Sequence, residues 1–350
     1  MTWLSKLARP DIVALEPYRY AAWQPGFARL NANETPWRAP GDGSGAGLNR
    51  YPEPQSRALI ERLAALYRAA PETLLVCRGS DEGIDLLVRA FCRANQDAVL
   101  ICPPTFGMYA VAARIQGARV REVPLAADRG FALDADAVLE ACTREVKLVF
   151  LCSPNNPTGN LLDPDSILTV AKELAGRALV VLDQAYVEFA PSAAADVLPR
   201  PVNLVVLRTL SKAHGLAGAR LGTLIADPEV IALLRKVLTP YAVPQLVLEA
   251  VAAVLSPPHL RTLPRRIAEI CAERSRLQEA LAALPGVRAV LPSEANFLMV
   301  RFDDAGSRLA QSLAARLLVR DARAYPGLED ALRITIGTAE QNDALLRAWA

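Results

Sequence analysis

Short apolar runs alternate with helical patterns from about residue 71 to residue 245. Four runs are apolar on both faces: DAVLIC (97–102), KLVFLC (147–152), ALVVLD (178–183) and NLVVLR (203–208). Such runs are typical of strands that are buried on both sides in a parallel sheet. Helical patterns such as DSILTVAKELAGR (165–177) lie between them. The alternation predicts an α/β domain with a mostly parallel sheet, built from right-handed βαβ units and flanked by helices.

The pattern changes after Pro244. Two long helical patterns follow, QLVLEAVAAVL (245–255) and RRIAEICAERSRLQEALAALPG (265–286), and then two strand-like runs, ANFLMVRF (295–302) and ALRITIG (331–337). We therefore expect a smaller α+β domain over residues 246–350, after a large domain over residues 31–245. Residues 1–30 are expected to form an N-terminal arm that associates with the small domain.

Composition excludes several classes of function. The 350 residues carry a formal net charge of +2 without a basic run, so nucleic acid is not an expected partner. The six cysteines are dispersed without a CxxC pair and there are two histidines, so we expect reduced core thiols and no metal site. The N-terminus lacks the apolar core of a signal peptide, and no apolar run is long enough to cross a membrane. The expected location is the cytoplasm. The glycine-rich GDGSGAG (41–47) follows no strand and is interpreted as a loop.

The segment RTLSKAHGLAGAR (208–220) places Lys212 directly after an apolar strand. Enclosure there would lower the pKa of the amine and make it a nucleophile. Taken alone, a solvated lysine at a helix start is the more frequent explanation. The neighbouring segments therefore decide between the two.

Polar residues follow two of the other buried runs. Asp183 closes ALVVLD, where it is either a helix cap or a ligand for a cationic group. Asn156 lies in SPNNPTGN, which is either simply a rigid turn or a turn that orients the Asn156 amide toward a ligand oxygen. In open parallel sheets, ligands bind at the carboxyl ends of the strands, where both residues are expected.

A phosphate site is predicted nearby. RGSDEG places Ser80 and Asp81 at a helix start, whose free N–H groups can bind phosphate, and Arg220 follows Lys212 by eight residues. A nucleophilic lysine, an acid for a cationic ring nitrogen, an amide for a ring oxygen and a phosphate site are together what pyridoxal phosphate requires. Tyr109, in PPTFGMY, is expected to stack on the ring face of this cofactor.

These segments resemble the fold-type I pyridoxal-phosphate aminotransferases, and within them the histidinol-phosphate aminotransferases. The resemblance extends from about residue 12 to residue 340 and rests on LNRYPEPQ, RGSDEGIDLLVRAFC, PPTFGMY, CSPNNPTG, DQAYVEF, RTLSKAHGLAGAR and LRITIG. It implies that Lys212 forms the Schiff base and shuttles the proton, and that Asp183 pairs with the ring nitrogen. It also implies the remaining cofactor contacts: Asn156 and Tyr186 at the 3-oxygen, and Ser80, Asp81, Ser211 and Arg220 at the phosphate.

The resemblance further implies a site shared across a homodimer, because Tyr51 matches a tyrosine that binds the cofactor phosphate of the partner subunit. Arg333 matches the arginine that binds the anionic group of the substrate, and Arg320 and Tyr18 match residues that help to bind its phosphate. Two departures stand out. His214 occupies a position where an aromatic residue is common, which favours packing over catalysis, and LNANETP replaces the more frequent LNENP.

The implied reaction transfers the amine of L-histidinol phosphate to 2-oxoglutarate, giving imidazole-acetol phosphate and glutamate in histidine biosynthesis. An aminotransferase for aromatic or other amino acids and a threonine-phosphate decarboxylase remain alternatives with the same lysine and arginines. A regulator that has kept the cofactor fold would need a DNA-binding module, for which the chain has no spare length.

Overall fold

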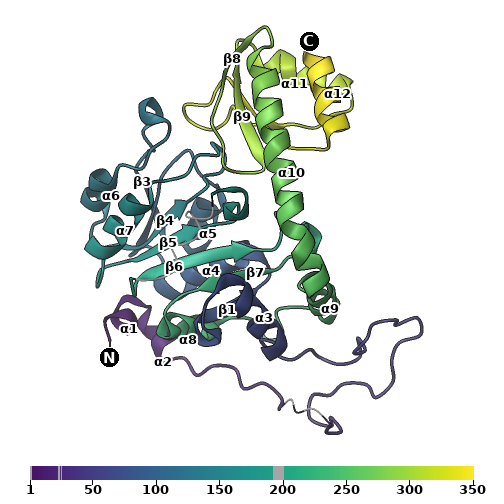
Figure 1. Ribbon diagram of the computed structural model, residues 1–350. Helices are drawn as coiled ribbons and strands as arrows, with labels where there is room; N and C mark the ends of the chain where they lie inside the picture. The colour runs from purple at the N-terminus through teal and green to yellow at the C-terminus, as the bar shows by residue number, and fades with distance from the viewer. Residues whose placement is uncertain (1, 23, 25, 192–200) are drawn as a thin grey trace.

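The computed structural model describes residues 2–22, 24, 26–191 and 201–350, and it contains two sheets (Figure 1). The large sheet has seven strands in the order β1-β7-β6-β5-β4-β2-β3. Their bounds are β1 Leu74–Cys77, β2 Ala98–Ile101, β3 Arg119–Glu122, β4 Val146–Cys152, β5 Leu179–Asp183, β6 Leu204–Thr209 and β7 Gly222–Ile225. Strand β7 runs antiparallel to both β1 and β6, whereas β2, β3, β4, β5 and β6 pair in parallel. The four runs predicted as buried strands are confirmed as β2, β4, β5 and β6.

Helices cover both faces of this sheet, so alternate side chains along each strand enter two separate cores. One face carries α3 (Arg57–Tyr67), α6 (Ala135–Ala141), α7 (Pro164–Glu173) and α9 (Gln245–Val254). The other face carries α1 (Trp3–Leu7), α2 (Pro10–Ala14), α4 (Gly79–Phe91), α5 (Met108–Gln116) and α8 (Pro228–Val237). Burial on both faces explains why these strands are apolar throughout.

The small domain is a four-stranded antiparallel sheet packed against helices. Its order is β10-β11-β9-β8, with β8 Val287–Val290, β9 Phe297–Phe302, β10 Arg320–Asp321 and β11 Ala331–Thr335. The helices are α10 (Pro257–Ala282), α11 (Ala305–Ala314) and α12 (Ala339–Trp349). Figure 1 shows α10 running from the large domain to the small one. The small-domain core takes Leu277 and Leu281 from the C-terminal part of α10. Val251 of α9 lies in a cluster that contains residues of the large sheet and also Met299 and Ala331 of the small one. The boundary between residues 245 and 246 therefore stays a prediction.

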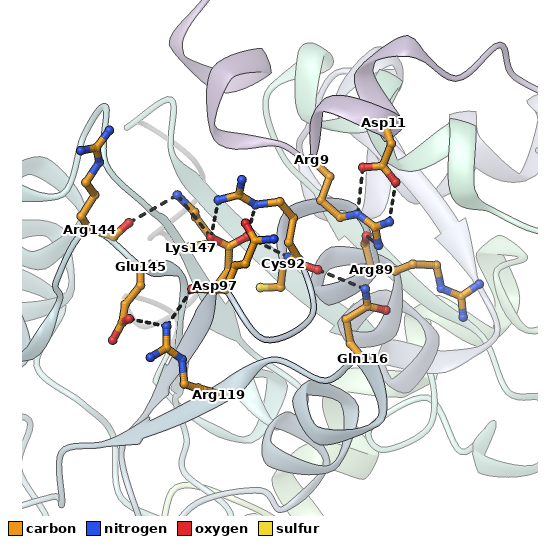
Figure 2. Close-up of polar contacts among 12 residues, drawn as sticks. Arg9, Asp11, Arg89, Cys92, Asp97, Gln116, Arg119, Arg144, Glu145 and Lys147 are labelled. Atoms are coloured by element: carbon orange, nitrogen blue, oxygen red, sulfur yellow. Dashed lines mark hydrogen bonds and ion pairs between the residues drawn. The ribbon is translucent and has the colours of Figure 1, made fainter.

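The N-terminal helices differ from the prediction. Residues 1–30 were expected against the small domain, but α1 and α2 pack on α8 of the large domain because Leu4 and Leu7 complete its core. Arg9 donates a hydrogen bond to the carbonyl of Arg89 at 3.0 Å (Figure 2). The chain between α2 and α3 contains no helix or strand among its described residues and extends away from the sheet (Figure 1).

A charged network lies at the edge of the sheet where the parallel strands begin (Figure 2). Asp97 is buried and binds Arg93 at 2.8 Å, and Lys147 lies 3.8 Å from it. Glu145 binds Arg119. Arg93 follows the C-terminus of α4, where a cation interacts favourably with the helix dipole, so the network has a structural explanation. The six cysteines are free, and five of them are buried. None of the helices in the described parts of the chain has the length and apolar character that a bilayer crossing requires.

Candidate active site

A cavity lies at the carboxyl ends of β4, β5 and β6, beside the N-terminus of α4. Its lining includes eight residues that the sequence predicts: Ser80, Asp81, Asn156, Asp183, Tyr186, Ser211, Lys212 and Arg220. Phe106, Cys152, Ala185 and Thr209 complete it. Segments more than a hundred residues apart in the sequence thus converge because parallel strands end at one edge of the sheet.

Lys212 lies in the loop that follows β6. Burial lowers the pKa of its amine, and the positive charges of Arg333 and Arg220 lower it further. Its Nζ lies 5.4 Å from the centroid of the Tyr186 ring. A lysine with a lowered pKa has a larger neutral fraction near neutral pH, which is the form that attacks a carbonyl carbon or accepts a proton.

Asp183 ends β5 and is buried, with only 3% of the residue exposed. Its Oδ2 accepts a hydrogen bond from the Tyr109 hydroxyl at 2.8 Å, and its Oδ1 accepts one from the Ala185 N–H at 3.0 Å. Burial raises the pKa of the carboxyl to about 6, although these two hydrogen bonds oppose the shift. A cationic group inside the cavity would stabilise the ionised form of this buried carboxyl.

The expected position of Tyr109 needs a correction. The tyrosine is fully buried below Asp183 and stacks on Phe150, with ring centroids 4.8 Å apart. It does not border the cavity, whereas Phe106, three residues before it and just ahead of α5, does. The aromatic residue available to cover a ring in the cavity is therefore Phe106, which the sequence offered in the same PPTFGMY segment.

The N-terminus of α4 and the loop after β6 form a narrow cradle. Gly79 has φ +81°, and a Cβ there would lie 2.8 Å from Nη2 of Arg220. A Cβ on Gly222 would lie 2.3 Å from the carbonyl carbon of Gly79. Strand β7 can therefore lie this close to the start of α4 only because residue 222 is a glycine. Arg220 Nη2 binds Asp81 Oδ2 at 2.9 Å. Free N–H groups, a hydroxyl from Ser211 and a guanidinium meet here, as phosphate binding requires.

The opposite wall connects the two domains. Asn156, from the turn after β4, accepts a hydrogen bond through Oδ1 from Nη1 of Arg333 on β11. The Arg333 guanidinium lies 5.1 Å from the centroid of the Phe297 ring, and its Nε is buried without a partner among the described residues. Arg320 on β10 is exposed and is the register partner of Arg333, so the two side chains project from the same face of the sheet.

The structure does not bring the two predicted tyrosines of the N-terminal segment into the cavity. Tyr51 is 50% exposed and stacks on Tyr241 at a centroid distance of 4.5 Å. Tyr18 is 62% exposed and packs edge-on against Tyr20 at 5.6 Å. Both lie on the segment that extends away from the sheet. The contact of Tyr51 with the cofactor of a second subunit and the contact of Tyr18 with the substrate phosphate therefore stay predictions.

Two of the cavity residues that were not predicted, Thr209 and Cys152, have only weak sequence features that would indicate a functional role. Thr209 is the last residue of β6, and Cys152 is the last residue of β4, so each occupies a strand end like that of Asp183. Cys152 is buried, and burial raises the pKa of its thiol. A small or apolar residue at a strand end is common in any sheet, so only the three-dimensional arrangement identifies these two.

Comparisons with known proteins agree with this geometry. The model of the aminotransferase class I and II family matches residues 24–348. The chain belongs to the aminotransferase class I and II family. Among its relatives, the histidinol-phosphate aminotransferase of Stenotrophomonas maltophilia (strain R551-3) is 53% identical over 98% of this chain and 95% of its own length.

Two solved structures are also similar to this chain. The histidinol-phosphate aminotransferase of Sinorhizobium meliloti in complex with pyridoxal-5'-phosphate has 26% identity and a TM-score of 0.78, covering 86% of this chain and 82% of that chain. The L-threonine-O-3-phosphate decarboxylase of Porphyromonas gingivalis has 30% identity and a TM-score of 0.71, covering 86% of this chain and 92% of that chain. Both similarities extend over the two domains, and the predicted fold class is confirmed.

Proposed function

We propose that this chain is a pyridoxal-phosphate-dependent transaminase that converts L-histidinol phosphate and 2-oxoglutarate to imidazole-acetol phosphate and glutamate, a step of histidine biosynthesis. The observation that carries the proposal is the convergence of Lys212, Asp183 and the open N-terminus of α4 on one cavity. The substrate is supported by the 53% identity to a histidinol-phosphate aminotransferase over nearly the whole chain.

The residues present fit pyridoxal phosphate. The cradle at Gly79 and Gly222, which a Cβ would fill, suits the phosphate, together with Ser80, Ser211 and Arg220. The raised pKa of the buried Asp183 carboxyl marks a place for a protonated ring nitrogen. When bound, the cofactor supplies an electron sink for the carbon that bears the substrate amine.

The chain's own groups would do the remaining work. Asp183 would keep the ring nitrogen protonated, because its negative charge stabilises the cationic nitrogen in a low-dielectric site. Asn156 and Tyr186 would donate hydrogen bonds to the ring 3-oxygen, and Phe106 would pack on the ring. The neutral amine of Lys212 would accept the proton from the substrate carbon and pass it to the cofactor.

Arg333 would bind the anionic group of each substrate in turn. One site must accept the phosphate of histidinol phosphate and a carboxylate of glutamate, and a guanidinium offers paired donors to both. Arg320 and Tyr18 would add contacts to the phosphate, which carries more charge and more acceptor oxygens. The proposed enzyme is a cytoplasmic homodimer in which Tyr51 reaches the cofactor phosphate of the partner subunit.

A threonine-phosphate decarboxylase is the second candidate. The 30% identity to such an enzyme over 86% of this chain favours it, since both substrates carry an amine and a phosphate. The two reactions differ in the bond that breaks at the amine-bearing carbon, C–H in transamination and C–C in decarboxylation.

Purified protein loaded with pyridoxal phosphate would be assayed with histidinol phosphate, histidinol, phenylalanine and threonine phosphate, each with 2-oxoglutarate. The proposal expects glutamate formation that is fastest with histidinol phosphate and depends on its phosphate. Faster turnover of phenylalanine, or release of carbon dioxide from threonine phosphate, would assign the chain to an alternative. Borohydride reduction followed by peptide mapping should place the cofactor on Lys212.

A further inference from the structure

A buried ion pair lies directly behind the cavity, outside its lining. Arg208 on β6 is only 8% exposed, and its side chain bonds two residues that follow β5. Nη1 donates to Oε1 of Gln184 at 3.0 Å, and Nη2 donates to Oε1 of Glu188 at 3.0 Å. The guanidinium lies over the Tyr67 ring of α3, 4.9 Å from its centroid. Glu188 belongs to the short 3-10 helix Val187–Phe189.

These bonds begin where the backbone pairing of β5 and β6 stops. The last register pair of the two strands is Asp183 with Leu207, and the final backbone bond runs from the Gln184 N–H to the Leu207 carbonyl at 3.0 Å. Beyond it, the two segments carry Tyr186 and Lys212. Side-chain contacts therefore help to set the spacing between these segments, and two hydrogen bonds of Arg208 cross from one segment to the other.

Stability alone is a poor reason for such a pair. Burying two charges costs about as much as their attraction returns, so apolar residues of similar size often serve equally well. Here Oε2 of Glu188 and Nε of Arg208 are also buried without a hydrogen-bond partner among the described residues. Burial raises the pKa of Glu188, while Arg208 lowers it. The nearby His214 has its pKa lowered to about 4 by burial and by Arg208, so it adds no charge near neutral pH.

We infer that Arg208 is a positioning residue, which through Gln184 and Glu188 fixes the hydroxyl of Tyr186 and the amine of Lys212 relative to each other. This role rests on the proposed function only in needing pyridoxal phosphate on Lys212. Without the pair, Tyr186 would donate a weaker hydrogen bond to the ring 3-oxygen, and the neighbouring amine nitrogen would hold its proton to higher pH.

The test replaces both charges with apolar groups of similar length, Arg208→Met with Glu188→Met. The melting temperature should stay close to that of the wild type. The pH midpoint of the visible absorbance of the bound cofactor should move upward, and kcat should fall roughly ten- to hundredfold with little change in KM. A midpoint and a kcat equal to those of the wild type would show that the pair serves only the fold.

Two single replacements keep the test decisive if the double variant does not fold. Glu188→Gln keeps an acceptor for Arg208 and should stay near the wild-type midpoint, whereas Glu188→Ala should show the shift. Equal midpoints in these two variants would overturn the inference. The absorbance is recorded without an amino donor, so it reports on Arg208 even if histidinol phosphate is not the substrate.

Discussion

The Tyr109 hydroxyl donates a hydrogen bond to Oδ2 of Asp183 at 2.8 Å, from a ring that is completely buried under the carboxylate. The tyrosine therefore acts on the cavity through Asp183, which it orients and partly stabilises in its ionised form. Burial raises the pKa of the Asp183 carboxyl to about 6, and the Tyr109 hydrogen bond keeps it from rising higher. The relationship leads to two predictions.

Tyr109→Phe keeps the stacked ring but removes the donor. The pKa of Asp183 should then rise above about 6, so the carboxylate is less completely ionised at neutral pH. A lost hydrogen bond to a charged group of about 1.5 kcal/mol would weaken pyridoxal phosphate binding roughly tenfold. Fluorescence titration of cofactor-free protein measures this, with the melting temperature as a control for folding. Unchanged affinity from pH 5 to pH 8 would remove Tyr109 from the cofactor site.

Asp183 should make the cofactor-free protein less stable as the pH rises. A carboxyl whose pKa rises on folding from 3.8 to about 6 favours the folded state below pH 4, and this contribution is lost as the pH passes about 6. The loss amounts to roughly 3 kcal/mol. Urea unfolding at pH 4.5 and pH 7.5 should therefore show different pH dependences for the wild type and Asp183→Asn, because the variant lacks the part of the change that Asp183 causes. Parallel curves for the two proteins would contradict the buried carboxyl.

His214 should have the opposite effect on stability and make the protein less stable as the pH falls. Burial lowers the pKa of its imidazole from 6.5 to about 4, so the folded state holds it neutral. Its contribution to stability is present above pH 6.5 and is lost as the pH falls through about 4, by roughly 3 kcal/mol. His214→Phe should remove this acid sensitivity while keeping most of the activity at pH 7.5. A large loss of kcat in this variant would instead give His214 a role in the reaction.

These residues show what the sequence could and could not predict. The buried strands were predictable because a short run that is apolar on both faces is rarely found outside a buried strand. The ends of these strands then identified Asp183 and Asn156. The partner of Tyr109 was not predictable, since only three residues separate Phe106, which precedes α5 and borders the cavity, from Tyr109, which lies beneath it. The packing of α1 and α2 against the large domain was also missed, because two apolar residues, Leu4 and Leu7, do not indicate which domain core they join.

The position of Tyr51 predicts that the site is shared between subunits. Tyr51→Ala and Lys212→Ala chains should each be strongly impaired, for different reasons. In a hybrid dimer, one site combines the Lys212 of one chain with the Tyr51 of the other and is intact. After subunit exchange, the mixture should regain roughly a quarter of wild-type activity, since half of the dimers are hybrids with one working site. No recovery despite demonstrated exchange would mean that each site is built from a single chain.

The anion site predicts how the two substrates are distinguished. Arg333 contacts Asn156 and has a buried, unpartnered Nε, while its register partner Arg320 is exposed at the edge of the small sheet. We therefore expect Arg333 to bind the anionic group of both substrates, and Arg320, which is more exposed, to contact only the larger phosphate group.

Arg333→Lys keeps the charge but loses the paired donors, so both half-reactions should suffer. Each lost charged hydrogen bond of about 1.5–3 kcal/mol corresponds to a roughly ten- to hundredfold loss of kcat/KM. Arg320→Ala and Tyr18→Phe should instead weaken histidinol phosphate and leave glutamate nearly unchanged. Single-turnover rates with each amino donor separate the two half-reactions. If Arg320→Ala impaired both donors equally, the phosphate and the carboxylate would have to share every contact, and selection for histidinol phosphate would have to come from the imidazole end of the substrate.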